Sequence, residues 1–188
     1  MKGALIVILI LLVIGGVLGG TVVSSYNQLV AERNDINERW AEVDNTMKRR
    51  ADLIPNLVET VKGYAKQEQT VIGEVTSARA ALLGARSPED KIAANSQLSS
   101  AIGRLLVLQE NYPQLKSNEN FQRLMDELSR SENRIALARH DYNEALRRYN
   151  TDVELFPKNL TASMFGFQRN DSYFKADEQE KKVPAVRF

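Results

Sequence analysis

Residues 3–23 read GALIVILILLVIGGVLGGTVV, a stretch that contains no charged side chain. At about 1.5 Å of rise per residue, a helix of this length spans about 30 Å, the thickness of a bilayer's hydrocarbon core. A single segment can satisfy its backbone hydrogen bonds there only as a helix. Lys2 flanks one end, and Tyr26 is placed to lie at the interface beyond the other. We therefore predict a transmembrane anchor over residues 1–25.

A cleaved signal peptide is the competing interpretation, and its removal would leave a soluble exported binding domain. Against it, the apolar stretch is long, Lys2 is the only basic residue before it, and no Ala-x-Ala site follows. The lack of cysteine also excludes a lipoprotein anchor. The orientation stays open, because Lys2 and the α-amine on one side nearly balance Arg33 and Arg39 on the other under the positive-inside rule.

Four glycines form two overlapping GxxxG spacings within the anchor, Gly15 to Gly19 and Gly16 to Gly20. Glycines at this spacing let a second helix approach closely, so that packing between the helices drives association. Glycine is also common in membrane helices that have no such role. We predict self-association through these four glycines, and hence a homo-oligomer.

The rest of the chain is hydrophilic and electrically balanced. The whole chain of 188 residues has a mean hydropathy of −0.34 despite the anchor. The formal net charge is +1, and Lys2 supplies one positive charge, so 24 basic and 24 acidic residues follow the anchor. A neutral domain argues against nucleic acid binding through phosphate neutralisation and against a polybasic lipid switch. Without cysteine, disulfides, thiolate nucleophiles and cysteine-bound metals are excluded.

Apolar residues recur every three to four positions after the anchor, and no long alternating stretch indicates a sheet. Ser87-Pro88-Glu89-Asp90 is typical of a helix start, and Pro113 and Pro157 are expected to end helices. The pattern predicts helices over about 26–50, 55–84, 88–112 and 118–156. Short connections between amphipathic helices favour an all-α fold, with the anchor followed by an up-and-down antiparallel four-helix bundle over 26–157.

The stretch from Arg49 to Pro55 leaves one boundary open. A residue before proline avoids the α conformation, and proline suits the first turn of a helix. This predicts a helix end near Arg50 and a restart at Pro55. One continuous, kinked helix is the alternative, because the apolar spacing resumes in register from Ile54. No linker-like composition separates the anchor from the first helix, so the two are expected to form one rod.

The C-terminal tail, 158–188, is expected to be irregular. It is aromatic up to residue 174, and the charged stretch from Ala176 to Lys182 is expected to be disordered. Such aromatic density favours packing on the bundle or on a partner. The candidate partner surface consists of Phe165, Phe167, Tyr173 and Phe174.

Several long motifs resemble those of the LemA family. The main one runs from Arg49 to Ala65 and reads RRADLIPNLVETVKGYA. The others are Tyr26-Asn27-Gln28-Leu29-Val30, Trp40, Glu110-Asn111-Tyr112-Pro113-Gln114-Leu115-Lys116, Glu132-Asn133-Arg134-Ile135-Ala136, Tyr149-Asn150 and Gly166-Phe167. The chain departs from the family at Gln67-Glu68, where His-Glu is frequent, so a role for an imidazole there is excluded.

The resemblance implies a bacterial inner-membrane protein with a single N-terminal membrane helix and a helical-bundle domain. It also implies a short outward-facing N-terminus and a cytoplasmic domain. The family's biochemical role is poorly defined, and no catalytic residues can be transferred from it. Members are associated with membrane-bound metalloproteases, and one branch with magnetosome membranes.

The residue types give little indication of catalysis. His140 is the only histidine, and Asp141 beside it points elsewhere on a helix, so a surface or boundary role is expected. The chain has no inward-facing Glu-x-x-His pair for a di-metal site, no Gly-x-Ser-x-Gly, no His-Glu-x-x-His and no phosphate loop. We therefore expect no catalytic residue, no metal and no cofactor.

Three charged residues, Arg33, Arg50 and Glu68, fall on the apolar stripes. Either they lie at the stripe edges with their charged ends in water, or they pair across helices and set the register. Two Tyr-Asn dipeptides, Tyr142-Asn143 and Tyr149-Asn150, recur on the fourth helix. The tyrosines are expected in the core, and their asparagines either lie on an adjoining face or meet a partner helix.

These observations favour a non-enzymatic, membrane-anchored helical scaffold that self-associates and organises the membrane or its proteins. The alternative is an adaptor that presents substrates to a membrane metalloprotease, which rests on the family resemblance alone. Expected partners are the lipid bilayer and further copies of the chain. Nucleic acid is not expected.

Overall fold

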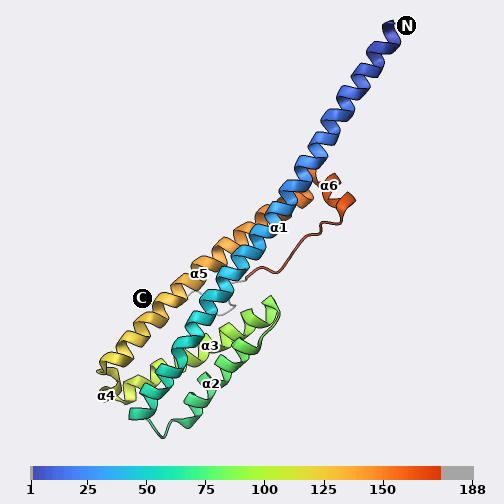
Figure 1. The fold of residues 1–188 in the computed structure, drawn as a ribbon. Helices are drawn as coiled ribbons and strands as arrows, with labels where there is room; N and C mark the ends of the chain where they lie inside the picture. Colours follow the sequence, from blue (N-terminus) through green and yellow to red (C-terminus); the bar gives the residue numbers. More distant parts are fainter. Residues whose placement is uncertain (1, 175–188) are drawn as a thin grey trace, which may run out of the picture. The chain divides into compact units, whose positions relative to one another are not determined.

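The computed structural model describes residues 2–174, and these residues confirm the all-α fold. The expected disorder from Ala176 to Lys182 lies outside the described residues. The elements are α1 (Lys2–Tyr64), α2 (Gln69–Gly84), α3 (Pro88–Leu108), the 3-10 turn η1 (Gln109–Asn111), α4 (Pro113–Lys116), α5 (Glu119–Glu154) and α6 (Lys158–Phe165) (Figure 1).

The chain divides into two compact units. The anchor unit contains α1 as far as Trp40 and the segment Asp141–Asp171, which includes the end of α5 and all of α6. The bundle unit contains Ala41–His140 and resumes at Ser172. Because α1 and α5 are long, each contributes residues to both units.

Four helical segments build the core of the bundle unit: the last part of α1, α2, α3 and the first part of α5. They alternate in direction, as the predicted up-and-down bundle requires, and α2 lies beside α3 (Figure 1). Each segment buries its apolar stripe. The largest fully buried side chains there include Met47, Leu57, Leu98, Leu105, Phe121 and Ile135.

The predicted break between Arg50 and Pro55 is wrong. α1 is helical without interruption from Lys2 to Tyr64 and includes Pro55. The proline is exposed, whereas Ile54 and Leu57 beside it are buried. Core packing of this stripe outweighs the local cost of proline inside a helix, about 3 kcal/mol. The chain turns instead between α1 and α2, and the expected continuity of the anchor with the first helix is confirmed.

The start of α3 is as predicted. The hydroxyl of Ser87 accepts a hydrogen bond from the backbone N–H of Asp90 at 3.1 Å, and Pro88 occupies the first turn. α3 ends at Leu108, earlier than expected, and the chain continues through η1 and the short α4 that begins at Pro113. α5 ends at Glu154, close to Pro157 as predicted.

In the anchor unit, α5 packs along α1. Leu29 and Ile36 of α1 are buried. The rings of Trp40 and Tyr142 lie with their centroids 5.5 Å apart. Tyr142 and Tyr149 are both buried, which confirms the core role predicted for them.

Residues 158–165 form α6 rather than the expected irregular tail. The helix ends at Gly166, whose φ of 74° is a left-handed conformation that glycine adopts without steric cost. The small residues Thr161 and Ala162 form the buried face of α6. Because this buried face carries no large apolar side chain, the usual apolar periodicity did not predict the helix.

Candidate functional site

Among the residues that the structure describes, one helix is long and apolar enough to cross a membrane, the N-terminal part of α1. The mean hydropathy of its most apolar window is 2.9, and none of that window is buried. Its large side chains, from Leu5 to Leu18, are all about half or more exposed. This surface has the composition of a membrane span and lies uncovered by the rest of the described chain.

The four glycines of the predicted association face lie on this uncovered surface. A methyl group added at Gly15, Gly16, Gly19 or Gly20 would meet no atom within 4 Å. The described chain therefore leaves the face open to another helix. Self-association through these glycines stays a prediction.

The four aromatic residues of the candidate partner surface are divided between the two units. The rings of Phe165 and Phe167 both contact the ring of Tyr26. The ring centroids are 4.8 Å apart for Phe165 and Tyr26, and 5.7 Å apart for Phe167 and Tyr26. The guanidinium of Arg33 stands over the ring of Phe167 at 5.4 Å, and Phe167 is only 9% exposed. Phe167 therefore packs on α1 of its own chain.

The other two aromatic residues of this set, Tyr173 and Phe174, belong to the bundle unit and are half-buried. There the guanidinium of Arg139 lies 5.1 Å from the ring of Phe174. Both ends of the aromatic segment thus contact helices of the chain itself.

The segment after α6 is held by two side chains of α5. Asn150 donates to the backbone carbonyl of Asn170 at 2.7 Å and accepts from its N–H at 2.9 Å. The hydroxyl of Tyr149 donates to the carbonyl of Gln168 at 2.9 Å, and burial raises the pKa of Tyr149. Asn150 therefore meets the chain's own C-terminal segment. The sequence offered only the repeated Tyr-Asn dipeptide as a signal for this clamp.

A polar cluster joins α1, α5 and α6 in the anchor unit. Gln28 donates to the carboxylate of Asp152 at 2.9 Å and to that of Glu32 at 3.1 Å. Lys158 of α6 forms an ion pair with Asp152. Burial and a hydrogen bond with Asp152 raise the pKa of Glu32. Sequence reasoning missed this cluster because its members lie far apart along the chain.

A buried arginine connects three helices of the bundle unit. Arg50 of α1 is 4% exposed and lies 2.5 Å from the carboxylate of Glu132 on α5. It also donates to the hydroxyl of Ser99 on α3 at 2.9 Å and, more weakly, to the side-chain oxygen of Asn95 at 3.5 Å. Burial lowers the pKa of Arg50, although Glu132 opposes this shift.

This network decides between the two interpretations of the charged residues on the stripes. The prediction that Arg50 pairs across helices is confirmed by its contact with Glu132. Glu68 fits neither interpretation, because it lies in the connection between α1 and α2 rather than on a helix. There it accepts a hydrogen bond at 3.0 Å from the hydroxyl of Tyr112, which lies in the connection before α4. Arg33 instead lies exposed at the edge of its stripe.

Little in the described residues points to a reaction. His140 is exposed, as expected. Within residues 2–174, no three His, Asp or Glu side chains are grouped so that they could hold a metal ion. The ionisable groups with shifted pKa values contact other helices or neighbouring loops, as Glu32, Asp44 and Arg50 do.

The fold and these sites define an all-α protein with one N-terminal helix suited to membrane anchoring and a domain fixed by buried polar contacts. Residues 39–188 match the LemA family. Because this match covers most of the chain, the protein belongs to the LemA family.

Several relatives cover most of the chain. Magnetosome protein MamQ 2 of Paramagnetospirillum magneticum is 27% identical over 198 residues, covering 92% of this chain and 72% of that protein. Protein LemA of Metamycoplasma hominis is 25% identical over 159 residues, covering 82% of this chain and 71% of that protein. Magnetosome protein MamQ of Magnetospirillum gryphiswaldense is 23% identical over 175 residues, covering 79% of this chain and 64% of that protein.

Proposed function

We propose that this protein is a non-enzymatic, membrane-anchored scaffold that self-associates and organises the membrane or its proteins. One observation carries the proposal: the apolar first part of α1, with its glycine face, is uncovered, and the same helix continues unbroken into the part of the anchor unit that is packed against α5. A contact made by the glycine face in the bilayer is thus transmitted along a continuous helix to residues that α5 covers.

Confinement to a membrane supports association through a small face. Anchoring concentrates the chains in two dimensions, so weak contacts between them are sufficient. Glycine faces act by close backbone approach, which suits a surface where an added methyl group meets nothing of the same chain.

The relatives and the ionisable groups support the same function. Two relatives that align along most of the chain are named as magnetosome proteins, which fits a role in organising a membrane. The buried charge of Arg50 is engaged by Glu132 and Ser99, so its shifted pKa reflects packing between helices. Such a group is occupied with structure rather than available to a substrate.

Crosslinking in native membranes tests the proposal. The variant with Gly16→Ile and Gly20→Ile should lose most crosslinked oligomer, because the two side chains keep a second helix at a distance. The matched control, Val17→Ile with Thr21→Ile, adds bulk at the same spacing but about 100° further round the helix, outside the glycine face, and should crosslink as the wild type does. Unchanged crosslinking of the glycine variant would remove the glycine face from the proposal.

An adaptor for a membrane metalloprotease is the second candidate. It requires the segment from Phe165 to Phe174 to be available to another protein. Burial of Phe167 and the clamp on Asn170 argue against that availability. A pull-down of the protease with Phe165→Ser, which alters a half-exposed ring only, tests the adaptor without removing the segment. Undiminished capture by this variant would contradict it.

A further inference from the structure

Several large apolar side chains of α6 and of the residues before it are exposed. Phe156 is 78% exposed and Met164 is 70% exposed, and Leu155, Leu160 and Phe165 are each at least half exposed. Leu160 and Met164 are one turn apart and therefore share a face of α6. The face packed against the chain carries the small residues Thr161 and Ala162 instead. The helix thus has its large apolar side chains on the outside, the reverse of a helix in a soluble domain.

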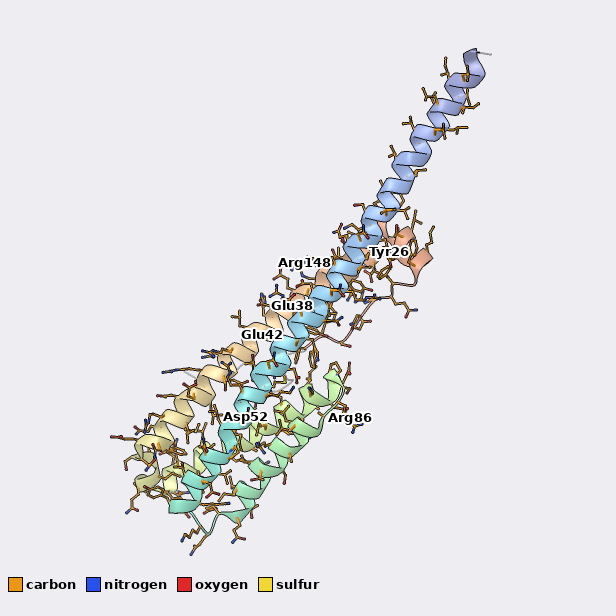
Figure 2. The ribbon with its side chains drawn as sticks, in the orientation of Figure 1. Tyr26, Glu38, Glu42, Asp52, Arg86 and Arg148 are labelled. Carbon is orange, nitrogen blue, oxygen red and sulfur yellow. The ribbon has the colours of Figure 1, made fainter. Side chains whose placement is uncertain are left out.

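The position of α6 along α1 relates this surface to the anchor. Phe165 contacts Tyr26, with 4.8 Å between the ring centroids. Tyr26 lies three residues after Val23, the last residue of the apolar stretch, which is about 4.5 Å along a helix. Figure 2 shows Tyr26 beside α6 within the anchor unit. The exposed side chains of α6 are therefore held at the level where the membrane span ends.

That level corresponds to the lipid interface. The headgroup regions add about 5–8 Å to the hydrocarbon core on each side, and helices that lie in the interface bury their apolar face about 5–10 Å deep. Tyrosine is enriched at the same depth. A surface held at Tyr26, three residues beyond the apolar stretch, falls within the layer where such helices bind.

The charges around α6 are compatible with this depth. From Pro157 to Gln168 the only charged residue is Lys158, and it is paired with Asp152. Beyond it, Arg169 lies 2.5 Å from Glu154 and 2.6 Å from Asp171. The charged groups of this segment are thus paired within the protein.

We propose that α6, together with Leu155 and Phe156, is a second membrane contact that inserts its apolar side chains into the lipid interface beside the emerging anchor. The occupant of the surface is lipid rather than another protein. This contact fixes the angle between α1 and the bilayer, because the anchor unit then touches lipid at two points. The inference requires the membrane anchor but not self-association.

Nitroxide labels test the contact in the full-length chain reconstituted into lipid vesicles. The chain has no cysteine, so Leu160→Cys and Met164→Cys each give a single labelling site. The control is Arg148→Cys, which replaces an exposed residue of α5 in the same unit (Figure 2). Because all three side chains are exposed, unchanged helicity by circular dichroism is expected.

Collisions of the labels with oxygen and with a water-soluble nickel chelate distinguish the outcomes. Lipid contact predicts labels at 160 and 164 that collide several-fold more with oxygen than with nickel, and a label at 148 with the reverse preference. Free access of nickel to all three would overturn the proposal. Protection of 160 and 164 from both reagents would also overturn it, since it would indicate a protein occupant.

The same labels separate this inference from the proposed function. In the variant with Gly16→Ile and Gly20→Ile, crosslinked oligomers are expected to disappear while the preference for oxygen at 160 and 164 stays unchanged. A preference that disappears together with the oligomers would show that association, not lipid, covers α6, and would contradict the inference.

Discussion

Two parts of the same helix meet different surroundings. From Leu5 to Leu18, α1 has only exposed large apolar side chains, and no residue of the described chain covers them. From Val43 to Val61, the helix buries an apolar residue at nearly every turn. The second part is stabilised by its own fold, whereas the first requires lipid or another copy of the chain. Helix continuity alone therefore says nothing about which solvent a segment needs.

The same contrast separates α6 from the helices of the bundle unit. α2 and α3 turn Ile72, Leu82, Leu98 and Leu105 inward, whereas α6 turns its large side chains outward. Exposed apolar faces of this kind are uncommon on soluble domains unless they contact a membrane or a partner.

The largest effect on stability is expected when a leucine is replaced by alanine in the buried part of α1, and the same replacement in the exposed part is the comparison. Leu57→Ala removes a fully buried side chain and should lower the free energy of unfolding by about 2–5 kcal/mol. Leu11→Ala, made on the exposed part, should leave the stability of the bundle unchanged. Urea unfolding of the full chain in detergent, followed by circular dichroism, measures both. Similar losses for the two variants would contradict the comparison.

A smaller effect is expected from the polar network of the bundle unit. Glu132→Ala leaves the buried Arg50 without its carboxylate and should destabilise the fold by about 1–3 kcal/mol, since Glu132 itself is partly exposed. Glu127→Ala on the same helix removes an exposed carboxylate and is the control. Adding Arg50→Met to Glu132→Ala should recover part of the loss in the same unfolding measurement. Strictly additive losses would show that the two residues do not interact.

The smallest effect is a pH dependence of opposite sign in the two units. The pKa of Glu32 is raised above its ordinary 4.5, so its protonated form stabilises the anchor unit. That contribution is complete below pH 4.5 and is lost as the pH rises through the folded pKa. The fluorescence of Trp40, the only tryptophan, reports unfolding of this unit. The urea concentration at the midpoint of the anchor unit's unfolding should fall with rising pH, and Glu32→Gln should reduce that fall.

Asp44 in the bundle unit provides the comparison. Burial raises its pKa, but hydrogen bonds from Lys91 and Lys48 outweigh burial and hold the pKa below its ordinary 3.8. Its contribution to stability is present above pH 3.8 and is lost as the pH falls through the folded pKa. Asp44→Asn should therefore reduce stability at neutral pH and reduce the acid sensitivity of the bundle. If Asp44→Asn instead raised the stability of the bundle unit at neutral pH, the assignment would be contradicted.

The sequence predicted what local chemistry determines. The cap at Ser87 and the end of α5 near Pro157 depend on neighbouring residues only, and both were predicted correctly. The helix through Pro55 depends on how Ile54 and Leu57 pack against other helices, which outweighed the local preference. Periodicity placed Arg50 on the stripe, but only the fold brought Glu132 and Ser99 to it.

α6 shows a second limit. Its apolar residues follow the helical period, yet they face outward, so a rule that places apolar faces in a core gives no expectation for them. The clamp of Asn150 on Asn170 likewise joins positions that no local pattern relates.

The mass of the particle extracted from membranes into polymer nanodiscs tests the central claim, association through the uncovered anchor, most directly. One chain has a mass of 21.2 kDa. We predict a discrete assembly whose protein mass is a fixed multiple of that value and that dissociates when Gly16 and Gly20 are both replaced by isoleucine. A wild-type particle that contains a single chain would contradict the account.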